Sequence, residues 1–446
     1  MDPDPGSGHR FPTQNDHFNP VPTPLPSDSL ARICIIREGD YPWDPRVRNE
    51  VEALVAANHA VDVICLRRPG QPARERVGAV NVRRLRLPAE RGGWAQYLIQ
   101  YALFLIAAGT LVSGRHLRRR YDLIQVNSMP DTLVFAALIP KLLGARVLFD
   151  LHECMPEFVA SKFRVPLNHR AVRLVGFGEQ ASIRFADFAI TPTAQQRDAF
   201  VGRGADPAKI AVIMNTHGLM HRAPAASTPL PCPLPNAGEE TTFLLVCHGT
   251  IEERYGLDTL VRATALLRHE IPELRVAIYG DGSYRPTIAS LIERLGLSDR
   301  VFLSQGFVPF DELLAAIARA QAGVVAMKRD AFRDLTLCNK MFDFIGMGKA
   351  AIVSRTRSVE EYFGDSCFEM FTADDPQDLA RAIRRLHADP SRRQALAGRA
   401  RSVSDHYAWP GQRRAYQAIV DSLAAGERLP AAEHWIRIGE PRAVVH

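Results

Sequence analysis

Strand-like and helix-like stretches alternate along the chain from residue 32 onward. Short apolar runs such as RICII, AVDVICL and RVLFDL are separated by amphipathic stretches, and the pattern resumes after residue 241 with TFLLVCHG and LRVAIYGDG. Such alternation is typical of mostly parallel sheets that carry helices on both faces. We therefore expect an α/β protein with two doubly wound, Rossmann-like domains that face an interdomain cleft, where ligands bind.

The domain boundaries follow from the places where this alternation stops. Residues 219–240 hold five prolines and show no periodicity, so we expect a linker there. The N-terminal domain then covers residues 30–218, and the C-terminal domain covers residues 241–405. Residues 1–29 are rich in proline and lack the apolar stretch of a signal peptide, so we predict a disordered tail. A second tail is expected at residues 426–446.

Charge and cysteine content narrow the class of protein. The chain has 55 Lys and Arg against 49 Asp and Glu, a net charge of +6. This mild excess does not favour a nucleic-acid binder, although local arginine clusters suit an anionic ligand or surface. The seven cysteines are scattered without a C-x-x-C pair, which favours a reducing compartment. We therefore expect a cytoplasmic protein that binds no nucleic acid.

One long apolar segment raises the question of membrane contact. Residues 94–112 carry no charge, and four arginines follow within residues 115–120. A helix of this length spans ~28 Å, nearly a bilayer core. A single crossing would, however, separate the predicted strands at 81–87 and 122–127, which belong to one sheet. We therefore expect residues 94–120 to lie in the membrane interface with arginines on anionic headgroups, at the inner face of the cell membrane. A wholly buried core helix is the alternative.

The loop after the first predicted strand reads EGDYPWDPRVRNE. Asp44 suits the N-cap of the following helix, and Pro45 suits its first turn. Arg46 and Arg48 lie in that turn, where the helix dipole disfavours cations. Pairing with nearby carboxylates is one explanation. The other is that the loop overhangs the cleft and contributes to an anionic or sugar ligand.

A second polar group follows another predicted strand in VLFDLHECMPE. It contains Asp150, His152, Glu153 and Glu157, where the loop should open into the cleft. His152 could donate a hydrogen bond to a sugar hydroxyl or a leaving phosphate, and a structural histidine is the alternative. Thr191 lies at the end of a further strand.

The second half carries two glycine turns and one polar loop before a helix. Arg254 in CHGTIEERYG precedes a helix, and its guanidinium group can donate two hydrogen bonds to a diphosphate. Gly280 and Gly282 in IYGDG permit close approach of the backbone to a ligand. The helix that begins near Asn339 could hold phosphate at its amide end. Lys340 and Asp343 share one face of this helix, and Asp343 could accept ribose hydroxyls, with an intrahelical ion pair as the alternative.

Taken together, residues 32 to about 425 resemble a glycosyltransferase of family 4 with the GT-B fold. YPWDPRVRNEVEALVAANHAVDVICL is similar to the opening strand-loop-helix of that family, and FDLHECMPE to its D-x-H-E-x-x-P-E loop. HGTIEERYGLDTLVRA and NKMFDFIGMGKAAIVS resemble its diphosphate loop and donor-site helix. The stretch 406–425 resembles the final helix that such folds carry back across to the first domain.

The resemblance implies a nucleotide-sugar donor in the C-terminal half, an acceptor in the N-terminal half, retention of configuration, and no cofactor or required metal. His152, Arg254, Lys340 and Asp343 would carry the chemistry. The implied donor-binding residues are Gly249, Thr250, Gly280, Asp281, Gly282, Asp334, Leu335, Thr336 and Asn339. The acceptor side would comprise Asp44, Arg46, Arg48, Glu153, Glu157 and Thr191.

Two positions depart from the family pattern. The family commonly has two glutamates eight residues apart, whereas this chain has Leu335 and Asp343 at those places. The leading hypothesis is a transferase that moves a sugar onto a membrane-near or lipid-linked saccharide in cell-envelope or exopolysaccharide biosynthesis. The alternatives are a nucleotide-sugar 2-epimerase of the same fold and a catalytically weakened subunit that binds a nucleotide sugar.

Overall fold

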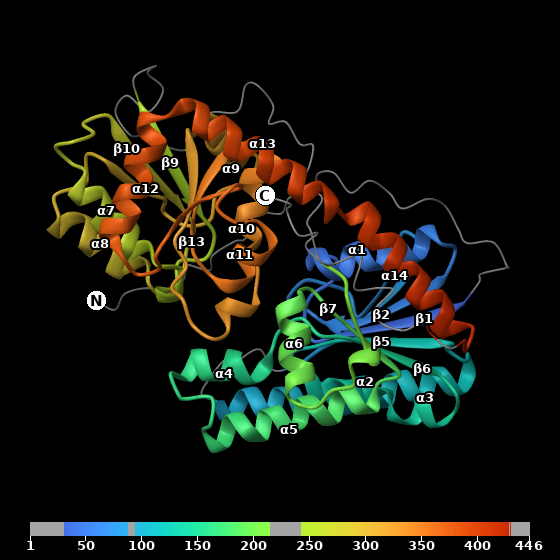
Figure 1. The fold of residues 1–446 in the computed structure, drawn as a ribbon. Helices are drawn as coiled ribbons and strands as arrows, with labels where there is room; N and C mark the ends of the chain where they lie inside the picture. The colour runs from blue at the N-terminus through green and yellow to red at the C-terminus, as the bar shows by residue number, and fades with distance from the viewer. Residues whose placement is uncertain (1–30, 88–93, 215–241, 428, 430–446) are drawn as a thin grey trace.

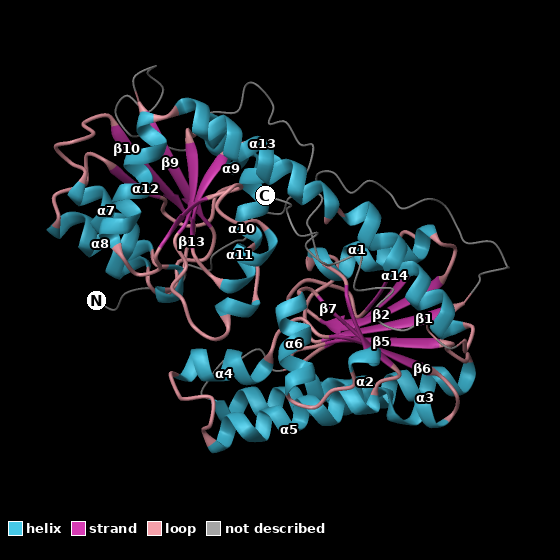
Figure 2. Ribbon diagram, in the orientation of Figure 1, coloured by secondary structure: helices cyan, strands magenta, loops and turns pink. Residues whose placement is uncertain are grey.

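A computed structural model of the chain describes residues 31–87, 94–214, 242–427 and 429. The described chain forms two α/β domains, each with a sheet between layers of helices (Figures 1 and 2). The expected N-terminal tail and linker, and most of the expected C-terminal tail, lie outside the described residues. This architecture confirms the predicted pair of doubly wound α/β domains.

The N-terminal sheet has eight strands in the order β3-β4-β2-β1-β5-β6-β7-β8. All neighbours are parallel except β3 and β4, which form an antiparallel pair at the edge. The strands are β1 (Arg32–Arg37), β2 (Ala60–Leu66), β3 (Arg74–Val77), β4 (Val80–Leu85), β5 (Leu123–Asn127), β6 (Arg146–Asp150), β7 (Phe188–Thr191) and β8 (Ile210–Val212).

Helices cover both faces of this sheet. The α-helices are α1 (Pro45–Ala56), α2 (Trp94–Arg118), α3 (Leu138–Leu142), α4 (Met155–Phe163), α5 (Arg170–Phe185) and α6 (Ala194–Gly202). Two 3-10 helices are η1 (Asp131–Ala137) and η2 (Pro207–Lys209). At the start of α1 the side chain of Asp44 accepts a hydrogen bond from the amide of Arg46, and Pro45 follows, as expected for an N-cap.

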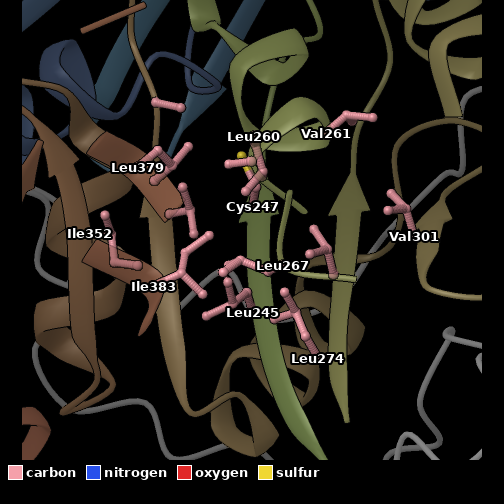
Figure 3. Packing of buried hydrophobic residues seen from close by; sticks show 14 of the residues in the cluster. Leu245, Cys247, Leu260, Val261, Leu267, Leu274, Val301, Ile352, Leu379 and Ile383 are labelled. Atoms are coloured by element: carbon pink, nitrogen blue, oxygen red, sulfur yellow. The ribbon is translucent and has the colours of Figure 1, made fainter. Parts of the chain in front are cut away.

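The C-terminal sheet has six parallel strands in the order β11-β10-β9-β12-β13-β14. They are β9 (Phe243–His248), β10 (Leu274–Tyr279), β11 (Val301–Leu303), β12 (Ala322–Val325), β13 (Ala350–Ser354) and β14 (Glu369–Phe371). The helices are η3 (Glu253–Tyr255), α7 (Leu257–Leu266), α8 (Arg285–Arg294), α9 (Phe310–Arg319), η4 (Arg333–Leu335), α10 (Asn339–Gly346), α11 (Arg357–Tyr362), α12 (Pro376–Ala388) and α13 (Pro390–His406). Leu245, Leu260, Leu274 and Ile383 meet in its core (Figure 3).

The last helix, α14 (Trp409–Ala424), follows α13 but packs on the N-terminal domain (Figure 1). Its buried side chains, among them Tyr416, Ile419 and Val420, belong to the same apolar cluster as Ile33 of β1 and Val51 of α1. The chain therefore crosses between the domains twice, and residues near the C-terminus complete the core of the N-terminal domain.

The long apolar segment forms α2, which has two different faces. Phe104, Ala108 and Val112 are buried in the core, whereas Ile106 is 65% exposed and Ile99 is also exposed. The alternative of a wholly buried helix is therefore wrong. Among the described residues, none of the helices has the combination of length and apolar character that a bilayer crossing requires.

Two local expectations differ from the structure. The strand β3 was not anticipated, because its sequence RERV is charged and largely exposed and pairs only at the sheet edge. The segment 131–142 is not one continuous α-helix, because it begins as η1 and continues as the short helix α3. Proline at 140 lacks the amide that a longer helix would use, which is consistent with this break.

Candidate functional site

Two turns of the C-terminal domain pack backbone against backbone beside the cleft. Gly249 follows β9 with φ 105°, and Gly280 follows β10 with φ 151°. A Cβ atom at Gly280 would lie 1.8 Å from the carbonyl oxygen of Gly249, and one at Gly282 would lie 2.3 Å from that of Ile251. These glycines are thus required for contact between the turns, whereas the sequence predicted approach to a ligand. The exposed side chain of Asp281 accepts a hydrogen bond from the Gly282 amide at 2.9 Å and so helps to shape the second turn.

Two cations lie close to the aromatic ring of Tyr255 in η3, which follows β9. The Nζ atom of Lys340 lies 3.6 Å from the ring centroid of Tyr255, and the guanidinium carbon of Arg254 lies 5.3 Å from it. The Lys340 side chain also covers Gly249, since a Cβ there would lie 2.4 Å from its Cε. Thr250 is exposed next to this group. The structure therefore brings Arg254 and Lys340 to the same aromatic ring, and Lys340 to Gly249.

Asp343 lies one helical turn beyond Lys340 and close to His248. Its Oδ2 is 3.4 Å from Nε2 of His248. Burial raises the pKa of Asp343 to about 7, although Lys340 opposes this shift, and burial lowers the pKa of His248 to about 3. His248 is therefore neutral near pH 7, and its Nε2 has no hydrogen-bond partner within the described residues. His248 was not among the predicted site residues, although its position at the end of β9 was an available signal.

The loop before α10 is used largely for contact between the domains. The carboxylate of Asp334 accepts hydrogen bonds from the Arg357 amide at 3.0 Å and from Arg329 at 2.9 Å. The side chain of Leu335 is buried in the apolar cluster of the N-terminal domain, and its carbonyl accepts from Thr193 at 2.7 Å. The Leu335 side chain therefore contributes to contact between the domains, and donor binding by this residue stays a prediction. Thr336 and Asn339 lie between η4 and the first turn of α10.

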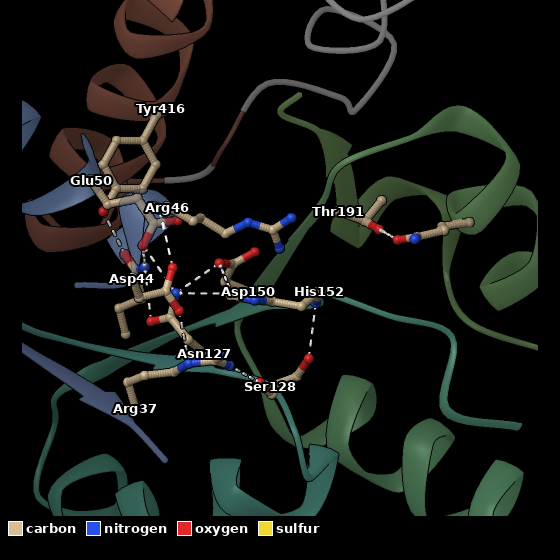
Figure 4. A network of polar contacts seen from close by, with 12 residues as sticks. Arg37, Asp44, Arg46, Glu50, Asn127, Ser128, Asp150, His152, Thr191 and Tyr416 are labelled. Atoms are coloured by element: carbon tan, nitrogen blue, oxygen red, sulfur yellow. Dashed lines mark hydrogen bonds and ion pairs between the residues drawn. The ribbon is translucent and has the colours of Figure 1, made fainter. Parts of the chain in front are cut away.

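On the N-terminal side, polar residues of four elements form a buried network (Figure 4). The Asp150 carboxylate lies 2.7 Å from Nε2 of His152 and accepts from Asn127 at 2.7 Å. Asn127 also donates to Glu50 at 2.9 Å. Gln125 donates to Glu50 at 2.8 Å and accepts from the hydroxyl of Tyr416 in α14 at 2.5 Å.

Burial sets the charge of this network. Burial and the neighbouring Asp150 carboxylate raise the pKa of Glu50 well above its ordinary value. Burial also favours a neutral Asp150, but the contacts with His152 and Arg46 hold its pKa below the usual range. Burial, followed by Arg46, lowers the pKa of His152 to about 4. Near pH 7, Glu50 and Asp150 therefore share one negative charge, and the imidazole of His152 is neutral.

Two polar groups beside this network lack partners. Nη1 of Arg46 and Oε2 of Glu153 are shielded from solvent and have no hydrogen-bond partner within the described chain. Burial raises the pKa of Glu153 to about 7, while Arg46, Arg37 and Arg254 oppose the shift. Pairing with nearby carboxylates was one explanation for the arginines in the first turn of α1. Arg46 meets it only in part, because Asp44 pairs with Arg37 at 3.3 Å and Nη1 of Arg46 has no partner in the described chain.

Three residues predicted on the acceptor side have other roles. Arg48 is exposed and lies 3.8 Å from Glu52 in the same helix, which matches local pairing. The Thr191 hydroxyl is buried and donates to Gln196 at 2.8 Å (Figure 4). Glu157 accepts from Arg203 at 2.6 Å. Arg48 and Thr191 thus have partners inside the N-terminal domain, and their contacts with a ligand stay predictions.

A cavity of about 800 Å³ lies between the domains and is lined by residues of both. The N-terminal domain contributes Glu153 and Phe158, and the C-terminal domain contributes Arg254, Tyr255 and Lys328. No cluster of three or more possible metal ligands is found in the part of the chain that the structure covers. The arrangement suits an anionic group beside Arg254 and hydroxyl groups beside Glu153.

Both domains of the chain are similar to known glycosyltransferases. The family model for the glycosyl transferase 4-like domain matches residues 44–216, and the model for glycosyl transferases group 1 matches residues 242–389. A D-inositol 3-phosphate glycosyltransferase of Kineococcus radiotolerans is 27% identical over 345 residues, which cover 72% of this chain and 78% of that relative. A GDP-mannose-dependent alpha-(1-6)-phosphatidylinositol monomannoside mannosyltransferase of Mycolicibacterium smegmatis is 29% identical over 192 residues, which cover 42% of this chain and 48% of the relative.

Solved structures share the fold over most of the chain. Sucrose-phosphate synthase of Thermosynechococcus elongatus has a TM-score of 0.70 at 21% identity and covers 89% of this chain and 100% of its own. HepE of Anabaena, solved with UDP-glucose, has a TM-score of 0.63 at 14% identity and covers 88% of this chain and 100% of its own. Both family models, in the order that the two domains require, together with these relatives, show that the chain belongs to glycosyltransferase family 4 and has the GT-B fold.

Proposed function

We propose that this glycosyltransferase takes its sugar from a nucleoside diphosphate sugar held by the C-terminal domain and transfers it, with retention, to a saccharide acceptor held by the N-terminal domain. The observation that carries the proposal is the pair of cations on Tyr255, with Nζ of Lys340 at 3.6 Å and the guanidinium carbon of Arg254 at 5.3 Å. A diphosphate is the part of such a donor that two adjacent cations bind best.

The reaction breaks the bond between the anomeric carbon and the diphosphate oxygen. Arg254 and Lys340 stabilise the charge that develops on this oxygen, so a metal ion is not required and no cofactor is needed. The acceptor oxygen forms its bond to the anomeric carbon on the face that the diphosphate leaves. The acceptor proton passes to the departing phosphate oxygen. Asp343 accepts hydroxyl hydrogen bonds from the donor, and His152 with Glu153 faces the reacting sugar.

The relatives support the class of donor and acceptor. HepE of Anabaena forms a complex with UDP-glucose, and the mycolicibacterial relative is a GDP-mannose-dependent phosphatidylinositol monomannoside mannosyltransferase. A relative from Rhizobium meliloti, 30% identical over 158 residues, is a lipopolysaccharide core biosynthesis glycosyltransferase. These proteins favour a nucleotide sugar as donor and a saccharide or glycolipid of the cell envelope or an exopolysaccharide as acceptor.

A membrane-near acceptor is favoured by the surface of the N-terminal domain. Helices α2 and α3 pack together and expose Ile106, Leu138 and Leu142 on their outer side. Arg118, Arg119 and Arg120 are exposed at the end of α2, whereas Arg115 is engaged by Asp62. Apolar side chains beside exposed arginines suit the interface of an anionic membrane. We propose peripheral binding at the inner face of the cell membrane.

Thermal unfolding of the full chain with UDP, GDP and their sugars tests the donor site. A ligand that binds the folded state alone raises the unfolding temperature by mass action. We expect at least one nucleoside diphosphate to do so, and Arg254→Ala to remove most of that rise without changing the unfolding temperature of the free protein. Arg262→Ala, which changes an exposed arginine of α7, is the matched control. An undiminished shift with Arg254→Ala contradicts the proposed site.

A further inference from the structure

The buried polar network of the N-terminal domain has few hydrogens for its many acceptors (Figure 4). These hydrogens can be counted, because a side-chain amide nitrogen carries two and a phenol carries one. The Tyr416 hydroxyl donates to Oε1 of Gln125 at 2.5 Å. Nε2 of Gln125 donates to Oε2 of Glu50 at 2.8 Å and to Oδ1 of Asn127 at 3.3 Å. Gln125 therefore has no hydrogen left for another group.

Asn127 also uses both of its hydrogens. Its Nδ2 atom donates to Oε2 of Glu50 at 2.9 Å and to Oδ2 of Asp150 at 2.7 Å. Nε2 of His152 lies 3.2 Å from that nitrogen and 2.7 Å from Oδ2 of Asp150. Because Asn127 has no third hydrogen, the short contact between His152 and Asp150 needs a proton of its own, on the imidazole or on the carboxyl group.

Glu50 decides between these two places for the proton. The carboxyl groups of Glu50 and Asp150 are hydrogen-bonded to each other, which requires one proton between them. Burial and the Asp150 charge raise the pKa of Glu50 well above its ordinary value. Burial opposes ionisation of Asp150 too, but His152 and Arg46 hold its pKa below the usual range. The proton of the pair therefore lies on Glu50, and the anionic Asp150 accepts a hydrogen bond from Nε2 of His152.

We propose that Glu50 and Asp150 are positioning residues that hold His152 as the tautomer with its proton on Nε2, so that Nδ1 accepts a hydrogen bond from a hydroxyl group of the reacting sugar. From the sequence, the imidazole was expected to donate to a hydroxyl group or a phosphate. An unprotonated Nδ1 instead binds a hydroxyl group as an acceptor and cannot donate to a phosphate. The contact with a sugar rests on the proposed function, whereas the tautomer depends only on the network.

The test is NMR of the ring nitrogens in the full chain, with isotope-labelled histidine. The spectra distinguish ring nitrogens that carry a proton from those that do not. The His152→Gln variant identifies the signals of residue 152 by their loss. At pH 7 we expect a proton on Nε2 and none on Nδ1. A proton on Nδ1 alone, or on both nitrogens, in the wild-type protein overturns the proposal.

Two variants test the positioning residues. Asp150→Leu removes the acceptor and frees one hydrogen of Asn127, whose Nδ2 lies 3.2 Å from Nε2 of His152. We expect the imidazole proton to move to Nδ1 in this variant. Glu50→Gln keeps a donor for Asp150 and an oxygen acceptor for the two amides, so the wild-type tautomer should persist. An unchanged tautomer in Asp150→Leu, or a changed one in Glu50→Gln, overturns the assignment. The Glu50→Gln and wild-type spectra decide the question even if Asp150→Leu does not fold.

Asp421→Leu is the matched control. It removes the carboxylate that lies 2.8 Å from Nε2 of His59, a second buried histidine of the N-terminal domain. This variant should change the signals of His59 and leave the tautomer of His152 as in the wild type. Asp150→Leu should do the reverse. A change at both histidines in each variant would mean a general loss of structure and would contradict a specific role for Asp150.

Titration with UDP, UDP-glucose, GDP and GDP-mannose tests the sugar contact. We expect a sugar nucleotide that stabilises the protein to shift the Nδ1 signal of His152, and the matching nucleoside diphosphate to leave it in place. Asp150→Leu should bind that sugar nucleotide about tenfold more weakly, with unchanged affinity for the diphosphate. An unmoved Nδ1 signal in a protein that the sugar nucleotide stabilises contradicts the acceptor role. Binding of none of the four compounds contradicts the donor chemistry, and with it the sugar contact, but leaves the positioning residues standing.

Discussion

Glu153 and Asp343 come from different domains and share one electrostatic property. Burial raises the pKa of each carboxyl to about 7, while arginine or lysine neighbours oppose the shift. Both groups therefore change charge near neutral pH, which is where a bound diphosphate or hydroxyl can shift the proton equilibrium. Such perturbed groups are frequent at ligand sites, and here they accompany unpaired polar atoms of Arg46 and Glu153.

The first prediction concerns Glu153→Gln. The folded pKa of Glu153 is about 7, against an ordinary value of 4.5, so the folded state favours the protonated acid. Its contribution to stability is fully present below pH 4.5 and is lost as pH rises through 7. Glutamine cannot ionise, so the variant should gain about 3 kcal/mol relative to the wild type as the pH rises between those limits. Urea unfolding across this pH range measures the difference.

An exposed carboxylate provides the control for this experiment. Glu52→Gln changes a side chain of α1 that is 53% exposed and pairs weakly with Arg48. It should leave the pH dependence of unfolding unchanged, because an exposed pair contributes little to stability. Parallel pH profiles for Glu153→Gln and the wild type would mean that Glu153 ionises freely in the folded protein.

At the scale of one element, α2 combines a buried stripe with an exposed apolar face. Phe104, Ala108 and Val112 anchor it to the sheet, so replacing an exposed residue should leave the fold intact. We expect Ile106→Asp to weaken binding to vesicles that contain phosphatidylglycerol about tenfold, because a charge replaces a side chain that inserts between headgroups. Vesicle sedimentation measures this binding.

The control for α2 is an apolar residue of similar exposure in the other domain. Leu266→Asp changes an exposed leucine at the end of α7, which is 55% exposed. It should not change vesicle binding if α2 and α3 form the contact surface. Equal binding by Ile106→Asp, Leu266→Asp and the wild type would remove the membrane part of the proposed function while leaving the transferase chemistry untouched.

The elements themselves were largely predictable from apolar periodicity. The predicted strand AVDVICL is β2 (Ala60–Leu66), and the helix predicted to begin near Asn339 is α10. Continuous apolar runs and amphipathic spacing are local properties that one element expresses by itself. The edge strand β3 was missed because it buries too little apolar surface to leave such a pattern.

At the scale of the whole molecule, contacts between distant segments hold the cleft together. The Thr193 hydroxyl donates to the carbonyl of Leu335 at 2.7 Å, and the amide of Ala194 donates to the Tyr362 hydroxyl at 2.9 Å. Phe158 and Phe332 meet across the interdomain cavity with ring centroids 5.5 Å apart. The loop before α10 therefore couples the relative position of the domains to the helix that carries Lys340.

The crossing of α14 leads to a prediction about stability. Ile419→Ala removes a fully buried side chain from the core of the N-terminal domain and should cost about 2 to 5 kcal/mol. Hydrogen exchange should show lost protection in β1 and β2, although residue 419 follows the entire C-terminal domain in sequence. Ile383→Ala, in the core of the C-terminal domain, should instead expose β9 and β10. Identical exchange patterns for the two variants would contradict this assignment of α14.

The amino-acid order was enough to predict two doubly wound domains, the strand ends that carry polar residues, and the family to which the chain belongs. Those properties depend on periodicity and on motifs within single segments. Tertiary packing decided which partners individual groups contact. Glu157 binds Arg203, which is 46 residues away, and the carbonyl of Leu335 accepts from Thr193, which is 142 residues away. No local pattern encodes such partners, because buried polar and apolar groups are satisfied by whichever neighbours the folded chain brings within reach.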